Sequence, residues 1–254
     1  EQQLAYATEN PENYKAVVTI NSYYQELYTP SDGVVSNGQD GKNATAKNLA
    51  GFVDSANQNG GYYIARYEAS YGSGYNEAGS TDAEKYANAK PLSKVSTGNS
   101  TSSMSHTPGI LWNFITQLNA AKVARNMYAE NKDINGNNVG VESDLVNSYA
   151  WDTAIVYIQE MGNIDYANKT DGNGYLKNTG KTGDVACNIY DMSANTYEWT
   201  TEYSINSDSR YVYPCVYRGG YYYSSNYYTA YRNNYGSTTN NGANISFRSI
   251  LYVQ

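Results

Sequence analysis

The sequence is poor in the residues that build metal and redox sites. It has one histidine, His106, and two cysteines, Cys187 and Cys215, among 254 residues. A site of two or three histidines is therefore excluded, and His106, next to a predicted helix start, is expected to have a surface or capping role. Two cysteines are too few for a disulfide scaffold. They form either one bridge or two small buried side chains, and the sequence leaves both interpretations open.

Charged residues are also scarce. They make up 16% of the chain, the formal net charge is −7 and the sequence pI is about 4.8. Nucleic acids and anionic membranes are bound by basic surfaces, so neither is predicted as a partner. No lysine follows Lys181, and no acidic residue follows Asp208. The C-terminal part is therefore polar but nearly uncharged, which suits a contact surface that does not have to desolvate ions.

Long apolar runs are missing as well, and none reaches the length that spans a bilayer. Direct insertion into a membrane is therefore not predicted. Residues 1–13, EQQLAYATENPEN, carry no signal-peptide pattern. Either a segment has been removed ahead of residue 1, or export does not use one.

The most unusual stretch is residues 221–244, which hold seven tyrosines and six asparagines. Its other residues are Ser, Thr, Gly and Ala, with Arg232 as the one exception. Without aliphatic side chains such a segment has little to bury, and its dense aromatics are not typical of disorder. Recognition loops favour this mixture, because tyrosine gives rigid contact area while Ser, Asn and Gly give adaptable hydrogen bonds. The composition predicts a displayed binding surface.

The remaining pattern predicts an α+β fold. Apolar spacing after the Thr107-Pro108 pair predicts a helix to about residue 129, and a second apolar stripe predicts a helix over residues 148–161, ended by Gly162. A short surface helix is predicted over residues 81–89. Strands are predicted at residues 14–20, 60–72, 187–192, 197–203, 212–217 and 245–253. Helices in the middle and strands at both ends favour two main helices packed on short antiparallel strands, with the terminal strands as neighbours.

Two polar loops, residues 133–142 and 165–173, are rich in oxygen ligands. Neither has EF-hand spacing, because the glycine and the final glutamate fall at the wrong offsets. They are either solvated turns or the site of one structural Ca²⁺ ion. No other metal and no cofactor is predicted.

An ordered set of motifs resembles a known family. NIYDMSANTYEWT at residues 188–200, RGG at 218–220 and SFR at 246–248 follow one another, after YYIARYEAS at 62–70. Together they resemble signatures of the formylglycine-generating-enzyme (sulfatase-modifying-factor) family, a variant of the C-type lectin fold. The resemblance covers residues 60–254 and leaves residues 1–59 as an N-terminal extension packed on, or leading into, that domain.

The resemblance implies structural roles for the motif residues. Glu198 and Arg218 are expected to pair in the interior, and Trp199 and Phe247 to fill the core. Gly219 and Gly220 are expected to permit close backbone approach, and Arg248 completes the set. Tyr197 and Tyr222 stand where the family has Trp, so Tyr222 is expected to be structural.

The enzymatic members need a cysteine pair between RGG and the last motif, or a multi-histidine iron site. Residues 218–248 contain neither Cys nor His. The tyrosine-rich stretch instead resembles the variable region of the variable proteins of diversity-generating retroelements. In those systems adenines of AAY codons are mutated, and every residue from 221 to 244 is reachable from such a codon.

Together with the composition, this resemblance implies a non-enzymatic protein on a bacterial surface or phage tail, whose variable region, about residues 213–245, is expected to bind a protein or other surface ligand. The alternatives are an oxidoreductase of the formylglycine-generating type, a Ca²⁺-dependent carbohydrate-binding lectin, or a structural pilus or tail subunit. The predicted contact residues are Tyr213, Tyr217, Tyr221, Tyr223, Ser225, Tyr227, Tyr228, Tyr231, Asn233, Asn234 and Tyr235.

Overall fold

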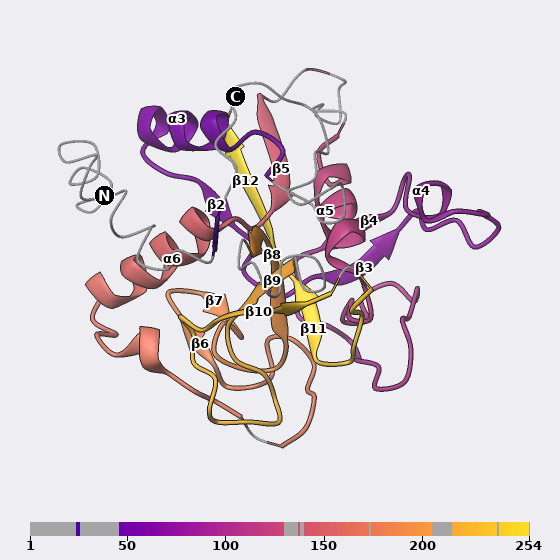
Figure 1. Ribbon diagram of the computed structural model, residues 1–254. Coiled ribbons are helices and arrows are strands. Elements are labelled where there is room, and N and C mark those ends of the chain that lie inside the picture. The colour runs from indigo at the N-terminus through magenta and orange to yellow at the C-terminus, as the bar shows by residue number, and fades with distance from the viewer. Residues whose placement is uncertain are drawn as a thin grey trace.

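The computed structural model describes residues 24–25, 46–129, 137, 140–172, 174–204, 215–237 and 239–253. In this part the chain is a mixed α+β structure, with two helices, α5 and α6, on either side of a central group of strands (Figure 1). The helices are α3 (Leu49–Asn59), α4 (Asp82–Lys85), α5 (Gln117–Asn126), α6 (Ser148–Glu160) and the 3-10 helix η1 (Tyr166–Asn168). The strands are β1 (Tyr24–Gln25), β2 (Tyr63–Ile64), β3 (Ser70–Ser73), β4 (Lys90–Leu92), β5 (Val141–Leu145), β6 (Val185–Ala186), β7 (Ile189–Tyr190), β8 (Tyr197–Ser204), β9 (Cys215–Arg218), β10 (Arg232–Gly236), β11 (Ile245–Phe247) and β12 (Ser249–Val253).

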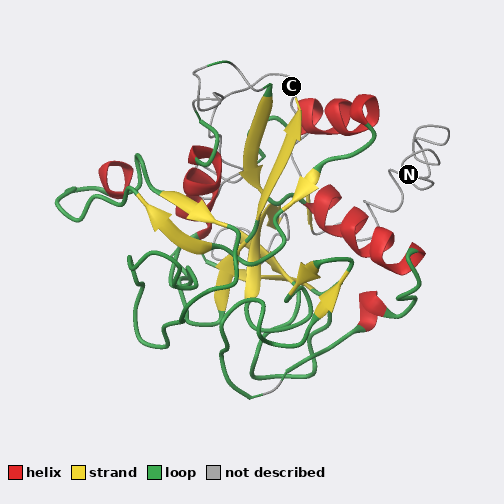
Figure 2. Ribbon diagram, turned by 180° about the vertical axis from the view of Figure 1, so that it is seen from behind, coloured by secondary structure: helices red, strands yellow, loops and turns green. Residues whose placement is uncertain are grey.

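The strands form several small sheets (Figure 2). The largest has the order β1-β8-β9-β10, and β11 also pairs with β8. A second sheet has the order β2-β12-β5, so the strand near residue 60 lies beside the last strand, as predicted. Among the strands of the described residues the pairing is antiparallel except between β11 and β8, which run parallel. That parallel pair departs from the wholly antiparallel prediction.

Helix α6 confirms the prediction for residues 148–161. The Asn147 side chain caps it by accepting a hydrogen bond from the Ala150 amide. Its apolar stripe is buried, with Trp151 and Ile158 fully enclosed. Gly162 follows the helix with a φ of 107°, a backbone conformation that favours glycine. Local signals were sufficient here because the apolar stripe and the terminal glycine, from which the helix was predicted, agree.

The helix predicted from Pro108 starts later than expected. Helix α5 begins after Thr116, whose side chain accepts from the Asn119 amide. Upstream, the Trp112 amide donates to the Ala69 carbonyl, so this segment pairs with the chain near β3 instead of coiling. The predicted start was wrong because it rested on a local signal, the threonine followed by proline. In the structure, main-chain groups of this segment form hydrogen bonds with a distant part of the chain and are not available for a helix.

The part of the predicted extension that the structure describes belongs to the same core. Helix α3, which the sequence analysis missed, is capped by Asn48 and ends at Gly60 in a left-handed conformation. The ring of Phe52 lies 5.1 Å from that of Tyr62 and 5.5 Å from that of Tyr252. Residues 46–59 are thus packed against the last strand. The strand predicted at residues 14–20 lies outside the described residues.

Three other predictions change in detail. Residues 60–72 form two short strands, β2 and β3, instead of one. Residues 187–192 form a hairpin with β6, since Cys187 and Asn188 have φ angles of 50° and 63° and make the turn. A short helix lies where one was predicted over residues 81–89, but α4 covers only Asp82–Lys85; it has a complete capping box between Thr81 and Glu84.

Candidate functional site

The tyrosines of the C-terminal stretch gather around one ring from the central sheet. Tyr197, at the start of β8, is buried. Its ring centroid lies 4.6 Å from those of Tyr217 and Tyr221, 5.5 Å from that of Tyr227 and 6.4 Å from that of Tyr231. These are distances at which aromatic rings attract one another. We call these five residues the tyrosine platform.

A second set of side chains projects from the platform into solvent. Tyr223 is 72% exposed and Tyr228 is 40% exposed, and Ser225 and Asn226 between them are exposed too. Tyr228 lies edge-on to Tyr231 of the platform, with ring centroids 5.8 Å apart. We call Tyr223, Ser225, Asn226 and Tyr228 the exposed face. It has hydroxyl, amide and aromatic groups and no ionised side chain.

Not every predicted contact residue is accessible. Tyr217 is 8% exposed and packs into the core, so we correct its expected role from contact residue to support of the platform. Asn233 is also 8% exposed, and its amide donates to a platform hydroxyl. Tyr213 lies outside the described residues. Asn234 and Tyr235 are on β10, but their side chains are not described.

Burial makes three phenols of the platform harder to ionise. It raises the pKa of the Tyr197 and Tyr217 phenols well above the ordinary tyrosine value, and neighbouring tyrosines add to the effect. The pKa of Tyr221 is raised for the same reasons. These phenols therefore stay protonated at neutral pH, and they act as hydrogen-bonding groups and not as anions.

The backbone of the tyrosine stretch is held by residues outside it. In Figure 1 the gold trace of residues 219–231 runs beside the orange trace of residues 162–184. The main-chain hydrogen bonds include Tyr222 N to Asn195 O (2.9 Å), Gly174 N to Tyr222 O (2.6 Å), Thr229 N to Lys169 O (3.0 Å), Ala230 N to Ala167 O (3.0 Å), Phe114 N to Gly242 O (3.2 Å) and Tyr197 N to Asn244 O (2.9 Å). The Trp151 indole donates to the Thr229 carbonyl at 3.0 Å. Main-chain bonds do not depend on which side chain a residue carries, so the loop path is largely independent of the exposed side chains.

The ion pairs behind the site differ from the expected one. Glu198 and Arg218 face each other across β8 and β9, but they do not form the interior pair. Glu198 binds Arg248, with nitrogen–oxygen distances of 2.6 and 2.9 Å. Arg218 binds Glu202 at 2.9 Å and also Asp152 of α6. The expected pair was wrong because β11 brings Arg248 to the other side of β8, where it reaches both Glu198 oxygens.

Arg232, the one charged residue in the stretch, joins this network. Its guanidinium donates to Glu202 at 2.8 Å and to Asp152 at 3.3 Å. The glycines of the RGG motif lie where the chains approach closely. A Cβ on Gly219 would stand 2.6 Å from the Met192 carbonyl oxygen, and one on Gly220 would stand 2.2 Å from that of Ser193. Trp199 and Phe247 are fully buried.

The sequence analysis missed Glu68 as a supporting residue. This buried carboxylate accepts from the Asn195 amide at 2.5 Å and from the Thr196 main chain and hydroxyl at 3.0 and 2.5 Å. Burial, with the charges of Asp191 and Glu198, raises the pKa of Glu68 well above its usual range. It holds the turn that precedes Tyr197. The sequence feature that could have identified Glu68 is an acidic residue within an apolar strand pattern.

A second residue outside the prediction is Tyr175. It is 65% exposed, and the Lys177 ammonium lies 5.6 Å from its ring centroid. This loop is packed closely on the tyrosine stretch, since a Cβ on Gly172 would meet the Ser224 backbone at 2.4 Å. Nothing in the sequence indicates this proximity, because it arises from the path of two loops.

The cysteines and the polar loops give no active-site arrangement among the described residues. Cys187 is exposed, Cys215 is buried, and both are free thiols. Burial raises the pKa of the Cys215 thiol, which disfavours the reactive thiolate. Within the described ranges, no group of three or more His, Cys, Asp or Glu is arranged to hold a metal. Most of residues 133–142 lie outside those ranges. The described helices include none long and apolar enough to cross a membrane.

Comparison with known proteins adds little. No family model matches the chain, and no curated protein matches it. Among solved structures, the crystal structure of CarF matches with 16% identity and a TM-score of 0.32. The match covers 44% of this chain and about half, 48%, of that one. At that score the likeness carries no argument about fold or function.

Proposed function

We propose that this protein binds a macromolecular surface ligand through the exposed face, and that it catalyses no reaction there. The observation that carries the proposal is the anchoring of the tyrosine stretch through main-chain atoms. Because residues outside the stretch hold its backbone on both sides of the exposed face, the exposed side chains are not needed to fix the path of the chain. Aromatic and small polar side chains on a fixed backbone are the composition of recognition loops.

The chemistry favours a protein ligand. Tyrosine is enriched at the centres of protein interfaces, where its ring is buried and its hydroxyl finds a partner. Burying a large side chain of this kind contributes about 1.5–3 kcal/mol. Tyr223 and Tyr228 are our main contact residues, with Ser225, Asn226 and Tyr175 beside them. The platform would hold these rings in place and so lower the entropy lost on binding.

The resemblance of the motifs extends this proposal. A C-type-lectin-like frame of the formylglycine-generating-enzyme type would hold a region diversified by a retroelement, on a bacterial surface or a phage tail. Two features support it: the reachable codon set of residues 221–244, and the buried positions of the motif residues Glu198, Trp199, Arg218 and Phe247. A copy of codons 215–250 beside a reverse-transcriptase gene, differing only at adenines, is the expected genomic sign.

Matched variants test the binding site. The pair Tyr223→Ala/Tyr228→Ala removes two exposed rings of the stretch. The control pair Tyr63→Ala/Tyr128→Ala removes two rings of similar exposure, 68% and 41%, elsewhere on the molecule. Both are screened for binding to arrays of purified bacterial surface proteins and to whole cells. We expect every ligand of the parent to lose at least tenfold in affinity with the first pair and to keep its affinity with the control. Equal losses in both pairs, or none in the first, would contradict the assignment.

A further inference from the structure

Five asparagines of the chain are followed directly by glycine. In such a pair the main-chain nitrogen of the glycine is able to attack the asparagine side chain, because glycine has no side chain to obstruct the approach. The structure describes the glycine of three pairs, Asn59-Gly60, Asn173-Gly174 and Asn241-Gly242. These three differ in what holds the two reacting groups.

In the first two pairs a hydrogen bond holds one of the reacting groups. The Asn59 side-chain nitrogen donates to the Ser55 carbonyl, one turn earlier in α3, at 3.0 Å. A side chain bonded to the preceding turn is not directed at the following nitrogen. In the second pair the Gly174 amide donates to the Tyr222 carbonyl at 2.6 Å, so its nitrogen has to lose that bond before it reacts. Folding therefore protects both pairs.

The third pair lies in the loop between β10 and β11, and its asparagine is exposed. Within the part of the chain that the structure describes, neither the Asn241 side chain nor the Gly242 nitrogen has a hydrogen-bond partner. The Gly242 carbonyl, in contrast, accepts from the Phe114 amide at 3.2 Å and from the Ile245 amide at 3.3 Å. The glycine is thus held by its oxygen, while its nitrogen is available for reaction.

We propose that Asn241 is a site of spontaneous deamidation in the folded protein. The Gly242 nitrogen forms a bond to Cγ of Asn241, and its proton passes through solvent to the side-chain nitrogen, which leaves as ammonia. The product is a succinimide ring. Water then opens the ring at one of its two carbonyl carbons. Cleavage between Cγ and the Gly242 nitrogen gives aspartate, and cleavage between the main-chain carbonyl carbon and that nitrogen gives isoaspartate.

Either product puts a negative charge where the chain has none. No acidic residue follows Asp208, and residues 237–243 are all uncharged. The end of the tyrosine stretch is therefore expected to become acidic as the protein ages. This inference does not depend on the proposed binding function, since it concerns only the chemistry of the pair.

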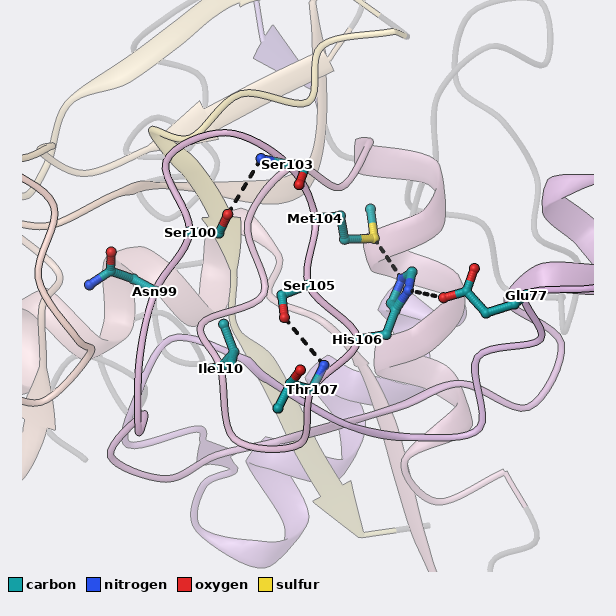
Figure 3. A pocket seen from close by; sticks show the side chains of 9 residues that line it. All are labelled: Glu77, Asn99, Ser100, Ser103, Met104, Ser105, His106, Thr107 and Ile110. Carbon is teal, nitrogen blue, oxygen red and sulfur yellow. Dashed lines mark hydrogen bonds and ion pairs between the residues drawn. The ribbon is translucent and has the colours of Figure 1, made fainter.

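Isoaspartate also adds one carbon atom to the main chain beside Gly242. The Gly242 carbonyl holds Phe114, whose φ of 56° is rare for a residue with a side chain. Next to it, the Asn113 side-chain nitrogen donates to the Ser100 carbonyl at 2.7 Å and to the Ala243 carbonyl at 3.0 Å. Ser100 lines a polar cavity of about 650 Å³ (Figure 3). The modification is expected to loosen the link between the stretch and the wall of this cavity.

Peptide mapping of the aged protein tests the proposal. The full-length chain is incubated at pH 8, and trypsin then places the three pairs in separate peptides, residues 48–66, 170–177 and 233–248. Mass spectrometry measures the exchange of an amide NH₂ for OH, and fragmentation locates it. We expect Asn241 to react at least tenfold faster than either other pair. A parallel incubation in urea should make the three rates similar, because the protecting hydrogen bonds are lost.

Two variants complete the test, with circular dichroism to confirm folding. In Gly242→Ala the added Cβ obstructs the attack, and it first meets the Asn244 side-chain oxygen, which is able to turn away. We expect deamidation of Asn241 to slow at least tenfold in this variant. The control Thr239→Ala, in the same loop, should react as the parent does. Equal rates at the three pairs in the folded protein, an order that persists in urea, or an unchanged rate in Gly242→Ala would overturn the assignment.

Discussion

Residues 221–228 and 229–236 both lack aliphatic side chains larger than alanine and both contain tyrosine and asparagine, although the first half has five tyrosines and the second has two, with one arginine. Their surroundings differ. The first half contains the exposed face, whereas the second contains buried Thr229, Asn233 and Gly236. The second half is packed because it becomes β10 and pairs with β9, while the first half crosses the surface as a loop. Composition therefore indicates what a segment is able to bind, and strand pairing determines which residues are accessible.

The largest expected effect is in the ion pairs that hold the second half. Glu202→Gln removes the charge that both Arg218 and Arg232 contact in the interior. We expect a loss of about 3 kcal/mol in the free energy of unfolding, because the buried Arg218 guanidinium loses its buried anionic partner and keeps only the half-exposed Asp152. Thermal unfolding followed by circular dichroism measures it. The control Asp152→Asn, at a side chain 40% exposed, should cost under about 1 kcal/mol. Equal costs would mean that the interior pair is not what holds β10.

A glycine comparison gives the next effect. In Gly236→Ala the added Cβ would stand 2.5 Å from the Cys215 carbonyl oxygen and 2.6 Å from the Trp199 ring. Such crowding typically costs about 1–3 kcal/mol. In Gly242→Ala the nearest atom is the side-chain oxygen of Asn244, which is able to turn away, so we expect a cost within about 0.5 kcal/mol. Chemical denaturation of both variants checks this difference, and a Gly236→Ala variant as stable as Gly242→Ala would contradict the close packing of β10 on β9.

The smallest effect is expected on the exposed face. Tyr223→Ala should change the free energy of unfolding by no more than about 0.5 kcal/mol, because the ring is 72% exposed. Tyr197→Ala is the contrasting variant, since it removes the ring at the centre of the platform. The urea midpoints of the two variants measure their stabilities, and we expect the lower midpoint in Tyr197→Ala. A marked loss in Tyr223→Ala would show that the exposed face supports the fold.

The sequence was sufficient to predict those elements that are marked by residues close to one another in the chain. Helix α6 was found because its apolar stripe and terminal glycine agree, and the terminal strands were expected to be neighbours because the helices lie between strands at both ends. Helix α3 was missed although Asn48 and Gly60 mark its ends, because it lies in a stretch rich in Asn and Gly. The ion-pair partners of Arg218 and Arg248 and the burial of Tyr217 could not be predicted. They depend on which strands lie beside β8, and that is set by long-range pairing.

The most direct test of the account is a saturation scan of residues 221–244, with surface display as the measure of folding. If main-chain bonds hold the stretch, almost any residue will be accepted at Tyr223, Ser225, Asn226 and Tyr228, while Thr229 and Gly236 will accept few. Uniform intolerance across both groups would contradict the claim that the exposed side chains are free to change.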